Sequence, residues 1–252
     1  MARILLAGES WSTTSIHTKG FDSFYTSSYE EGAEHFIAAV ERGGHEVDFM
    51  PNHVAADRFP ETAEELSRYD VVVLSDIGAN TLLLPARVFA RGQRMPDRLG
   101  VLADWVRGGG SLLMVGGYLS FQGIEAKANY RSTALAPVLP VILEAGDDRE
   151  ETPQGVVPRL LTRHPAIANV PAEFPHLLGY QRLTARPATE TLIAVDGRPL
   201  LVVGSSGSGR VAAFASDMGP HWLPQEFLEW EGFDPLWQSL ITWLANANKE
   251  NA

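Results

Sequence analysis

The chain has 252 residues, 45% of them hydrophobic, and its 20 basic and 31 acidic residues give a formal net charge of −11. A chain of this length and composition can bury one substantial core, and its acidic balance argues against a nucleic-acid partner, which would need clustered Lys and Arg. It contains no cysteine, which excludes disulfides, thiolate metal sites and cysteine nucleophiles.

The first half of the chain alternates apolar runs with amphipathic segments. Continuous apolar runs are typical of parallel strands buried on both faces, and helical periodicity with terminal glycines indicates helices between them. The predicted strands are Arg3–Gly8, His45–Met50, Asp70–Ser75 and Ser111–Val115, and the predicted helices are Tyr29–Arg42, Glu61–Arg68 and Pro96–Arg107. This order predicts βαβ units in a doubly wound, mostly parallel sheet.

After about residue 140 the pattern changes to strands with few helices between them. The predicted strands are Val141–Glu144, Val156–Leu160, Thr191–Val195, Leu200–Gly204 and Arg210–Ser216. The Gly/Ser run Ser205–Gly209 lies between two of them and predicts a hairpin turn rather than a phosphate-binding loop, which would need a helix directly after it. Phe233–Ala245 is predicted as a final helix. We expect one domain over residues 1–246 and a polar tail over 247–252.

A glycine-rich turn follows the strand Ser111–Val115. The segment Gly116–Ser120 stands where an α/β enzyme would present its nucleophile, but Tyr118 occupies its tip and Ser120 follows two residues later. A tyrosine hydroxyl near pKa 10 is a poor nucleophile, and Ser120 would need a base, for which His221, supported by Glu226, is a candidate. The sequence therefore indicates the α/β fold of an enzyme more strongly than it indicates any particular reaction.

As a whole the chain resembles the glutamine-amidotransferase-like family, which is related to class I glutamine amidotransferase domains. The matching segments are Gly8–Trp11, His17–Phe24, Tyr69–Asn80, Gly109–Gly123, Leu178–Tyr180 and Ala215–Trp222. The resemblance implies a flavodoxin-like α/β fold with additional C-terminal strands. In class I amidotransferases a cysteine at the turn attacks the glutamine amide with help from a histidine and a glutamate. Here the turn falls near Gly117–Tyr118 and His221-Trp222-Leu223 replaces the His-x-Glu pattern, so no glutaminase activity is expected.

Polar residues follow several predicted strands at their carboxyl ends, which converge on the ligand crevice in open α/β sheets. Glu9 and Ser10 follow the first strand, Asp76 the third, and Asp217 with His221 a late one. Together they could perform acid–base chemistry or hold a divalent metal, although no particular metal or cofactor is indicated. Helix capping and turn closure are the alternative roles for such residues.

The segment Glu9–Ser28 is predicted as a long loop, a feature that is often functional. Its residues His17, Lys19 and Asp22 could fold over the crevice as a lid, or they could simply be solvated side chains of a surface loop. With Gly117 and Tyr118 they complete the candidate ligand-binding set. Aromatic residues near the C-terminus, such as Trp222 and Trp237, favour packing or a contact between subunits over stacking on a ligand.

Three functions remain open at this point. The first is a module that binds a small polar molecule in the crevice, and the second is a non-thiol hydrolase or lyase that uses Asp76, Asp217, His221 or Ser120. The third is a subunit of a homo-oligomer. No apolar run approaches the roughly 20 residues of a membrane span, and the N-terminal run is too short for a signal peptide, so we expect a cytoplasmic protein without membrane contact.

Overall fold

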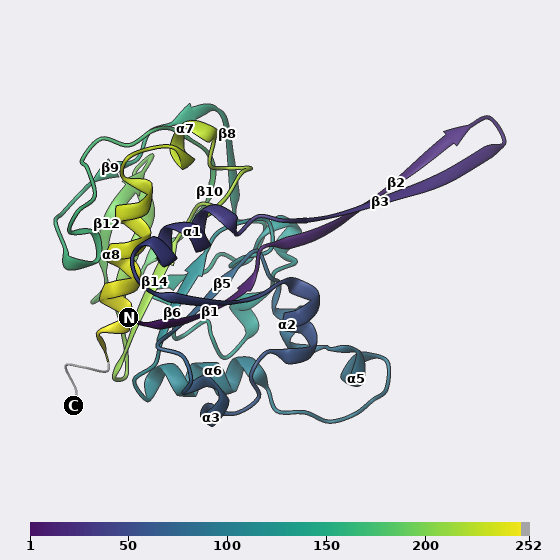
Figure 1. The fold of residues 1–252 in the computed structure, drawn as a ribbon, viewed down its shortest axis with the longest axis horizontal. Helices are drawn as coiled ribbons and strands as arrows, with labels where there is room; N and C mark the ends of the chain where they lie inside the picture. The colour runs from purple at the N-terminus through teal and green to yellow at the C-terminus, as the bar shows by residue number, and fades with distance from the viewer. Residues whose placement is uncertain (248–252) are drawn as a thin grey trace.

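The computed structural model describes residues 1–247, and an eight-stranded sheet forms its centre (Figure 1). The strand order is β4-β1-β5-β6-β14-β13-β12-β9. The strands of this sheet are β1 (Arg3–Gly8), β4 (Glu46–Met50), β5 (Val71–Ser75), β6 (Ser111–Val115), β9 (Arg159–Leu160), β12 (Glu190–Val195), β13 (Arg198–Ser206) and β14 (Gly209–Phe214). From β4 to β14 neighbours pair in parallel, and from β14 to β9 they pair antiparallel. This is the predicted α/β sheet with additional C-terminal strands.

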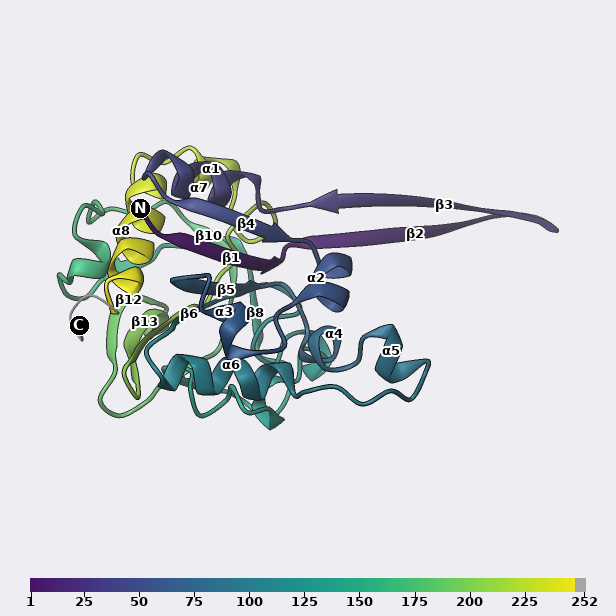
Figure 2. The ribbon, with the colours of Figure 1, turned by 60° about the horizontal axis from the view of Figure 1, so that its bottom comes forward.

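Helices cover both faces of the sheet. One group contains α1 (Glu34–Arg42) and α8 (Phe233–Ala245), which pack on each other, with α7 (Gln225–Leu228) nearby. The other group contains α2 (Asn52–Arg58), α3 (Ala63–Leu66), α4 (Ala79–Leu83) and α6 (Arg98–Arg107), with α5 (Ala86–Phe89) beyond them. Figure 2 shows the two groups on opposite sides of the strands. The central strands β1, β5 and β6 are therefore covered by helices on both faces, which explains their continuous apolar sequences.

Three two-stranded sheets lie outside the central one: β2 with β3, β8 with β10, and β7 with β11. Their strands are β2 (Ser10–Lys19), β3 (Asp22–Glu31), β7 (Val141–Ile142), β8 (Arg149–Val156), β10 (Leu177–Gln181) and β11 (Thr184–Ala185). Short 3₁₀ helices η1 (Ile124–Ala126), η2 (Tyr130–Ser132) and η3 (Pro165–Ile167) complete the elements. The sequence did not predict β2, β3, β10 or β11. The predicted strand Val156–Leu160 is divided between the last residue of β8 and the short strand β9, and the rest of β8 was not predicted.

Local sequence explains where the predicted helices begin and end. Asp97 begins α6, because its side chain accepts hydrogen bonds from the backbone N–H groups of Leu99 and Gly100, and glycines 108–110 follow its end. The predicted helix Tyr29–Arg42 is wrong at its start: Tyr29 belongs to β3, and α1 begins at Glu34. The Ser205–Gly209 hairpin is confirmed, since β13 and β14 pair up to Ser206 and Gly209.

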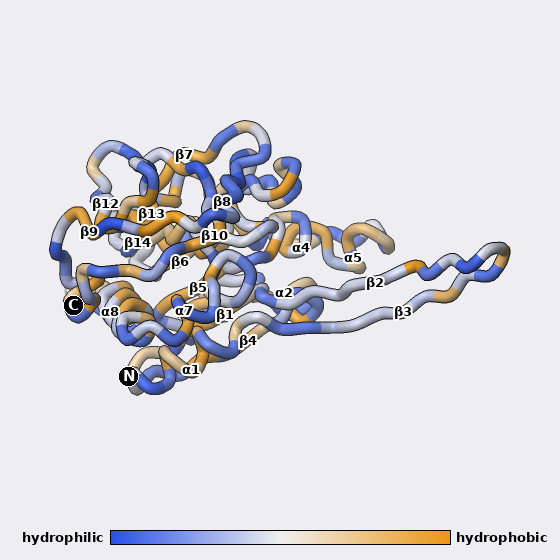
Figure 3. Tube along the Cα trace, turned by 90° about the horizontal axis from the view of Figure 1, so that it is seen from above, coloured by the Kyte–Doolittle hydropathy of each residue, from blue (hydrophilic) through white to orange (hydrophobic). Residues whose placement is uncertain are grey.

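The predicted loop Glu9–Ser28 is instead a long hairpin. Strands β2 and β3 pair residue by residue from Ser10 with Glu31 to Lys19 with Asp22, and the hairpin projects away from the body (Figures 1 and 2). Figure 3 shows that this hairpin is mostly hydrophilic with short hydrophobic interruptions, whereas hydrophobic stretches gather in the central sheet. The predicted tail over residues 247–252 lies, apart from residue 247, outside the described residues.

Candidate functional site

A cavity of about 480 Å³ lies at the carboxyl ends of β1 and β5, beside the turn after β6. Three carboxyl groups and an imidazole share it with apolar side chains. Its lining residues are Glu9, Trp11, Asp76, Tyr118, Leu119, Ile124, Asp217, Pro220 and His221. This is the edge at which the sequence placed Glu9, Asp76, Asp217 and His221, so the structure brings these four residues together.

The backbone at this cavity is held in an unusual conformation. Glu9 and Asp76 follow β1 and β5 with φ angles of 47° and 44°, and His221 has a φ of 130°. Positive φ is uncommon for residues other than glycine, and each such residue costs of order 1–3 kcal/mol. The turns that aim these three side chains at one cavity are therefore maintained against a local energetic cost.

Glu9 is the most enclosed of the three carboxyl groups. It is 3% exposed, and its Oε1 accepts a short hydrogen bond from the hydroxyl of Ser75 at the end of β5. Burial raises the pKa of Glu9 well above its ordinary range, and the charges of Asp217 and Asp76 raise it further. Gly32 leaves room beside this side chain, since a Cβ there would lie 2.8 Å from Oε2 of Glu9.

Asp217 and Asp76 share this environment. Burial raises the pKa of Asp217 well above its ordinary value, and the charge of Asp76 acts in the same direction. Burial also raises the pKa of Asp76, although its Oδ1 accepts a 2.6 Å hydrogen bond from the backbone N–H of Leu119, which favours the charged form. The cavity therefore holds three acidic groups that oppose one another's ionisation.

His221 is oriented by Asp217. The Nδ1 atom of the imidazole lies 3.2 Å from Oδ2 of Asp217, and the imidazole is 42% exposed. Burial lowers the pKa of His221, while the charges of Glu151 and Asp76 act in the opposite direction. The ring packs edge-on against Tyr118, with 4.5 Å between ring centroids. The arrangement leaves Nε2 without a hydrogen-bond partner among residues 1–247.

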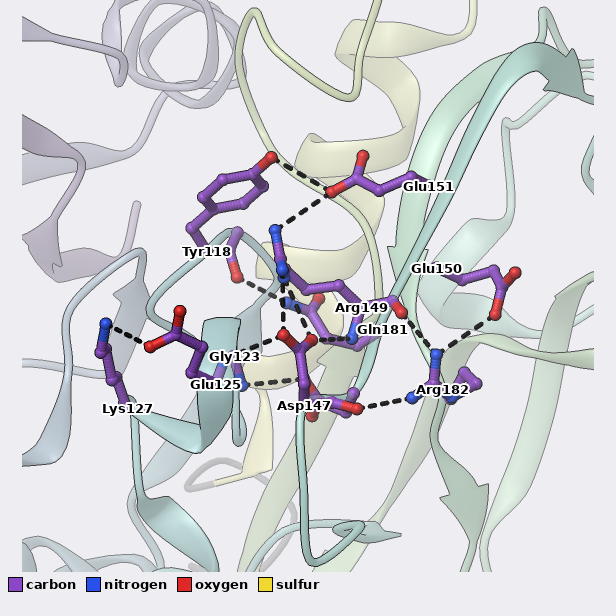
Figure 4. A network of polar contacts seen from close by, with 12 residues as sticks. Tyr118, Gly123, Glu125, Lys127, Asp147, Arg149, Glu150, Glu151, Gln181 and Arg182 are labelled. Atoms are coloured by element: carbon purple, nitrogen blue, oxygen red, sulfur yellow. Dashed lines mark hydrogen bonds and ion pairs between the residues drawn. The ribbon is translucent and has the colours of Figure 1, made fainter.

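A polar network fixes the turn after β6 (Figure 4). The Tyr118 hydroxyl donates to Oε1 of Glu151 at 3.1 Å, and the Arg149 guanidinium lies 4.6 Å from the centroid of the Tyr118 ring. Burial raises the pKa of Tyr118, so its hydroxyl is a still weaker nucleophile than an ordinary tyrosine. Glu151 also accepts from the indole of Trp222 at 3.0 Å. The sequence did not single out Glu151 or Arg149, because both come from the unpredicted early part of β8.

Gly117 fits tightly against Asp76. Its φ is 127°, and a Cβ at this position would lie 3.0 Å from atoms of the Asp76 side chain. Its carbonyl accepts a hydrogen bond from Nε2 of the buried Gln181. Gly117 therefore shapes the turn and packs against Asp76, but it does not itself line the cavity.

Three candidate residues do not line the cavity and make contacts elsewhere in the fold. The Ser120 hydroxyl is buried, accepts from the backbone N–H of Asp76 at 3.0 Å and donates to the carbonyl of Gly116 at 3.3 Å. Glu226 lies 3.5 Å from Nδ1 of His176, so the hypothetical Ser120–His221–Glu226 triad is not assembled. Ser10 is buried, and its hydroxyl accepts from the backbone N–H of Asn52 at 2.8 Å.

The remaining three candidates lie far from the cavity. His17, Lys19 and Asp22 are exposed near the tip of the β2–β3 hairpin and do not line the cavity. The predicted lid over the crevice is wrong for this chain, because the segment forms paired strands that extend outward. Trp11, at the base of the same hairpin, does line the cavity. It lies in the segment Gly8–Trp11 that carries the family resemblance, but it was not among the predicted site residues.

Residues 1–247 contain no group of three His, Asp or Glu side chains placed to hold a metal ion. Over the same residues no helix is long and apolar enough to cross a membrane.

Solved structures and family models identify the relatives of this chain. The cytoplasmic protein STM1381 of Salmonella typhimurium LT2 is 48% identical, with a TM-score of 0.93 over 96% of this chain and 99% of that one. The cytoplasmic protein STM3548 of Salmonella typhimurium is 44% identical, with a TM-score of 0.92 over 96% of this chain and 98% of that one. A ThuA-like protein of Bacteroides uniformis, 12% identical, has a TM-score of 0.56 over 96% of this chain and 91% of that one and shares the fold alone. None of the curated proteins matches the chain. The family model described as "Putative glutamine amidotransferase" matches residues 3–246, and the chain belongs to this GATase1-like family.

Proposed function

We propose that this protein binds a small molecule carrying a protonated amino group in the cavity formed by Glu9, Asp76 and Asp217. The observation that supports this proposal is that three carboxyl groups converge on a cavity lined by no Lys or Arg. An anionic ligand would meet three carboxyl groups there, with the His221 imidazole as the one basic side chain among the lining residues. Burial raises the pKa values of Glu9 and Asp217, and neighbouring carboxyl charges raise them further. A bound cation would offset both effects by favouring the ionised carboxylates, which a neutral polyol cannot do.

The apolar walls restrict the ligand further. Trp11 and Tyr118 can stack against a cation or a short hydrocarbon chain, and Leu119, Ile124 and Pro220 offer hydrocarbon contacts. A ligand with an amino group and a compact apolar part matches this combination. The volume of about 480 Å³ is within the range of small-molecule sites.

Glutamine hydrolysis through a thioester is not part of this proposal. The sequence contains no cysteine, and Gly117 with Tyr118 stands where the related enzymes carry their nucleophile. Because the two Salmonella relatives are described as cytoplasmic proteins, we propose the same location for this chain.

Calorimetry with a panel of primary amines, amino alcohols, polyols and carboxylic acids tests the proposal. We expect amines to bind and to release protons, because a bound cation lowers the pKa values of the cavity carboxyl groups. Glu9→Gln and Asp217→Asn should each weaken binding about 10–100-fold, the range for losing a hydrogen bond to a charged group. Glu64→Gln, which changes an exposed carboxyl on α3, is the matched control and should leave binding unchanged. Binding of polyols or acids in preference to amines would contradict the proposal.

The Asp217–His221 pair favours a second candidate function, acid–base catalysis on the bound molecule. A carboxylate at Nδ1 holds the imidazole in one tautomer and leaves Nε2 to take a proton from a ligand, as required in a hydrolase or lyase. If this function is present, His221→Ala should abolish turnover of a bound amine while changing its affinity less than Glu9→Gln does. Equal turnover in the wild type and His221→Ala would remove the imidazole from the mechanism.

A further inference from the structure

The β2–β3 hairpin has no packing partner of its own over most of its length. Its strands pair only with each other, and every residue of Trp11–Glu31 is exposed. An isolated two-stranded hairpin is marginally stable in water at best, and further strands normally have to join it. The β2–β3 hairpin has ten residues in each strand and projects from the body (Figures 1 and 2). We therefore expect another chain to stabilise it by pairing with one of its edges.

The hairpin also concentrates the exposed apolar side chains of the molecule. Twelve large hydrophobic residues are exposed within residues 1–247, and six of them lie in this segment. They are Trp11, Ile16, Phe21, Phe24, Tyr25 and Tyr29, and Phe21 at the tip is fully exposed. Exposed apolar groups gathered on one projection mark an interaction site.

The register places complementary groups at the two ends of one face. Side chains alternate between faces along a strand, and directly paired residues share a face. Trp11 paired with Glu30 lies at the base, and Lys19 paired with Asp22 lies at the tip of this same face. Near the tip, His17 stacks on Phe24 with 4.5 Å between centroids. Neither Lys19 nor Glu30 forms an ion pair within the described residues.

The charges of the two strands differ, which decides how two copies could pair. Strand β2 contains Lys19 and His17 but no acidic residue, whereas β3 contains Asp22, Glu30 and Glu31 but no basic one. Antiparallel pairing of two β3 edges would set Asp22 of one copy against Glu30 of the other. Antiparallel pairing of two β2 edges sets Lys19 against Trp11, with Glu30 on the next strand.

We propose that the hairpin is a dimerisation arm, in which the β2 edges of two copies pair antiparallel about a two-fold axis at Ser15. The backbone groups along the outer edge of β2 then find partners, and the four strands form one continuous sheet. At each end the ammonium of Lys19 lies beside the Trp11 ring of the second copy and within reach of Glu30. The interface is self-complementary, as a two-fold dimer requires.

The dimer also reaches the candidate site. Trp11 is a wall of the carboxyl-lined cavity, so the tip of the second copy's hairpin comes to lie at its mouth. Lys19 and His17, which lie far from their own cavity, then stand next to the cavity of the other subunit. This consequence rests on the proposed function, whereas the dimer itself does not, and dimerisation is measured without any amine.

Charge reversal tests the proposed contact. Light scattering between about 1 and 100 μM protein should show a dimer, and Lys19→Glu or Glu30→Lys should each weaken it about tenfold or more. The double variant Lys19→Glu/Glu30→Lys should restore the dimer. Within one copy these residues lie at opposite ends of the hairpin, eight residues or about 26 Å apart, so rescue can only come from a contact between copies. Asp22→Asn, on the outer strand, is the control and should dimerise as the wild type does.

A single introduced thiol tests the register, because the natural chain has no cysteine. Opposed residues in antiparallel strands have Cα atoms about 4.5–5.5 Å apart, which suits a disulfide. Ser15→Cys should therefore form a covalent dimer on oxidation, and Thr26→Cys, its partner on β3, should not. A monomer at all concentrations, a dimer unaffected by both charge reversals, or crosslinking through Thr26→Cys alone would overturn the proposal. So would a monomer whose hairpin binds phosphatidylcholine–phosphatidylglycerol vesicles.

Discussion

Lowering the pH from 7 to 5 is expected to strengthen the contribution of Asp148 to folding, opposite to the usual behaviour of carboxyl groups. Asp148 is completely buried, and its side chain accepts backbone N–H groups of Gln122 at 3.0 Å and Gly123 at 2.8 Å. These bonds favour the charged form. Burial outweighs them and raises the pKa of Asp148 from 3.8 to about 6.

The sign and size of this change in the free energy of unfolding follow from the linkage between protonation and folding. A carboxyl whose pKa is raised by folding binds its proton more tightly in the folded state, so its stabilisation is complete below pH 3.8 and is lost as the pH rises through about 6. A difference of about 2 units corresponds to about 3 kcal/mol in total, of which about 1.4 kcal/mol is gained between pH 7 and 5. For a chain of this size that gain raises Tm by about 3–5 °C.

The ionisable groups at the cavity also have shifted pKa values, so their effect on the pH dependence of stability must be separated from that of Asp148. The raised pKa values of Glu9, Asp76 and Asp217 act in the same direction. The lowered pKa of His221 acts in the opposite direction, because its imidazole resists protonation in the folded state as the pH falls below 6.5. The contribution of Asp148 is therefore measured by comparing the pH dependence of the unfolding free energy between a variant and the wild type.

Denaturant unfolding at pH 5, 6 and 7 should show that Asp148→Asn loses about 1.4 kcal/mol of the gain between pH 7 and 5. Asp147→Asn is the neighbouring comparison. The Arg149 guanidinium holds the pKa of Asp147 far below its usual range, so that residue stays ionised across this interval. Its charge is the smallest of the contributions to the raised pKa of Asp148, so its removal should change the slope much less than Asp148→Asn does. An Asp148→Asn profile parallel to that of the wild type would refute the reasoning.

Three further substitutions test the site and the packing around it. Gly32→Ala should weaken amine binding at least tenfold with little change in stability, because its Cβ would lie 2.8 Å from Oε2 of Glu9 and 3.1 Å from the Trp11 ring; calorimetry and thermal melts measure the two effects. Tyr118→Phe should leave amine affinity within about twofold in the same titration, since the hydroxyl is directed to Glu151. Arg98→Met should destabilise the fold by about 3–5 kcal/mol in denaturant unfolding, because the buried guanidinium donates to four backbone carbonyls; an unchanged midpoint would contradict that role.

The central sheet and the convergence of polar side chains at its carboxyl edge could both be predicted from the sequence, and for the same physical reason. Strands such as Val71–Ser75 and Ser111–Val115 are buried on both faces, so each is an uninterrupted apolar run, and the residue that follows such a run must lie at a strand end. Asp76 could therefore be placed from the sequence. The same reasoning predicted Glu9 beside it, because β1 and β5 are neighbours in parallel.

The hairpin could not be predicted in this way. Strands β2 and β3 bury neither face, so no alternation of apolar and polar residues marks them, and their Ser- and Thr-rich sequence resembles that of a loop. Glu151 was missed for a different reason. Its position beside Tyr118 depends on β8 pairing with β10, about 30 residues later in the chain, and no local pattern specifies that contact.

The contacts of the acidic residues bear on the alternative of helix capping. Asp97 is a helix-capping residue of this chain: its side chain accepts hydrogen bonds from the backbone N–H groups of Leu99 and Gly100 at the start of α6. Within residues 1–247 the Glu9 side chain accepts a hydrogen bond only from the Ser75 hydroxyl, and neither Glu9 nor Asp217 caps a helix of this part of the chain. Capping favours ionisation, yet the pKa values of Glu9 and Asp217 are raised. Asp76 and Asp217 do accept backbone N–H groups, from Leu119 and Met218, as turn-closing residues would. Burial of several carboxyl groups and left-handed backbone at Glu9 and Asp76 are both unfavourable, and their coincidence at one cavity is why we propose a cation site in addition to turn closure.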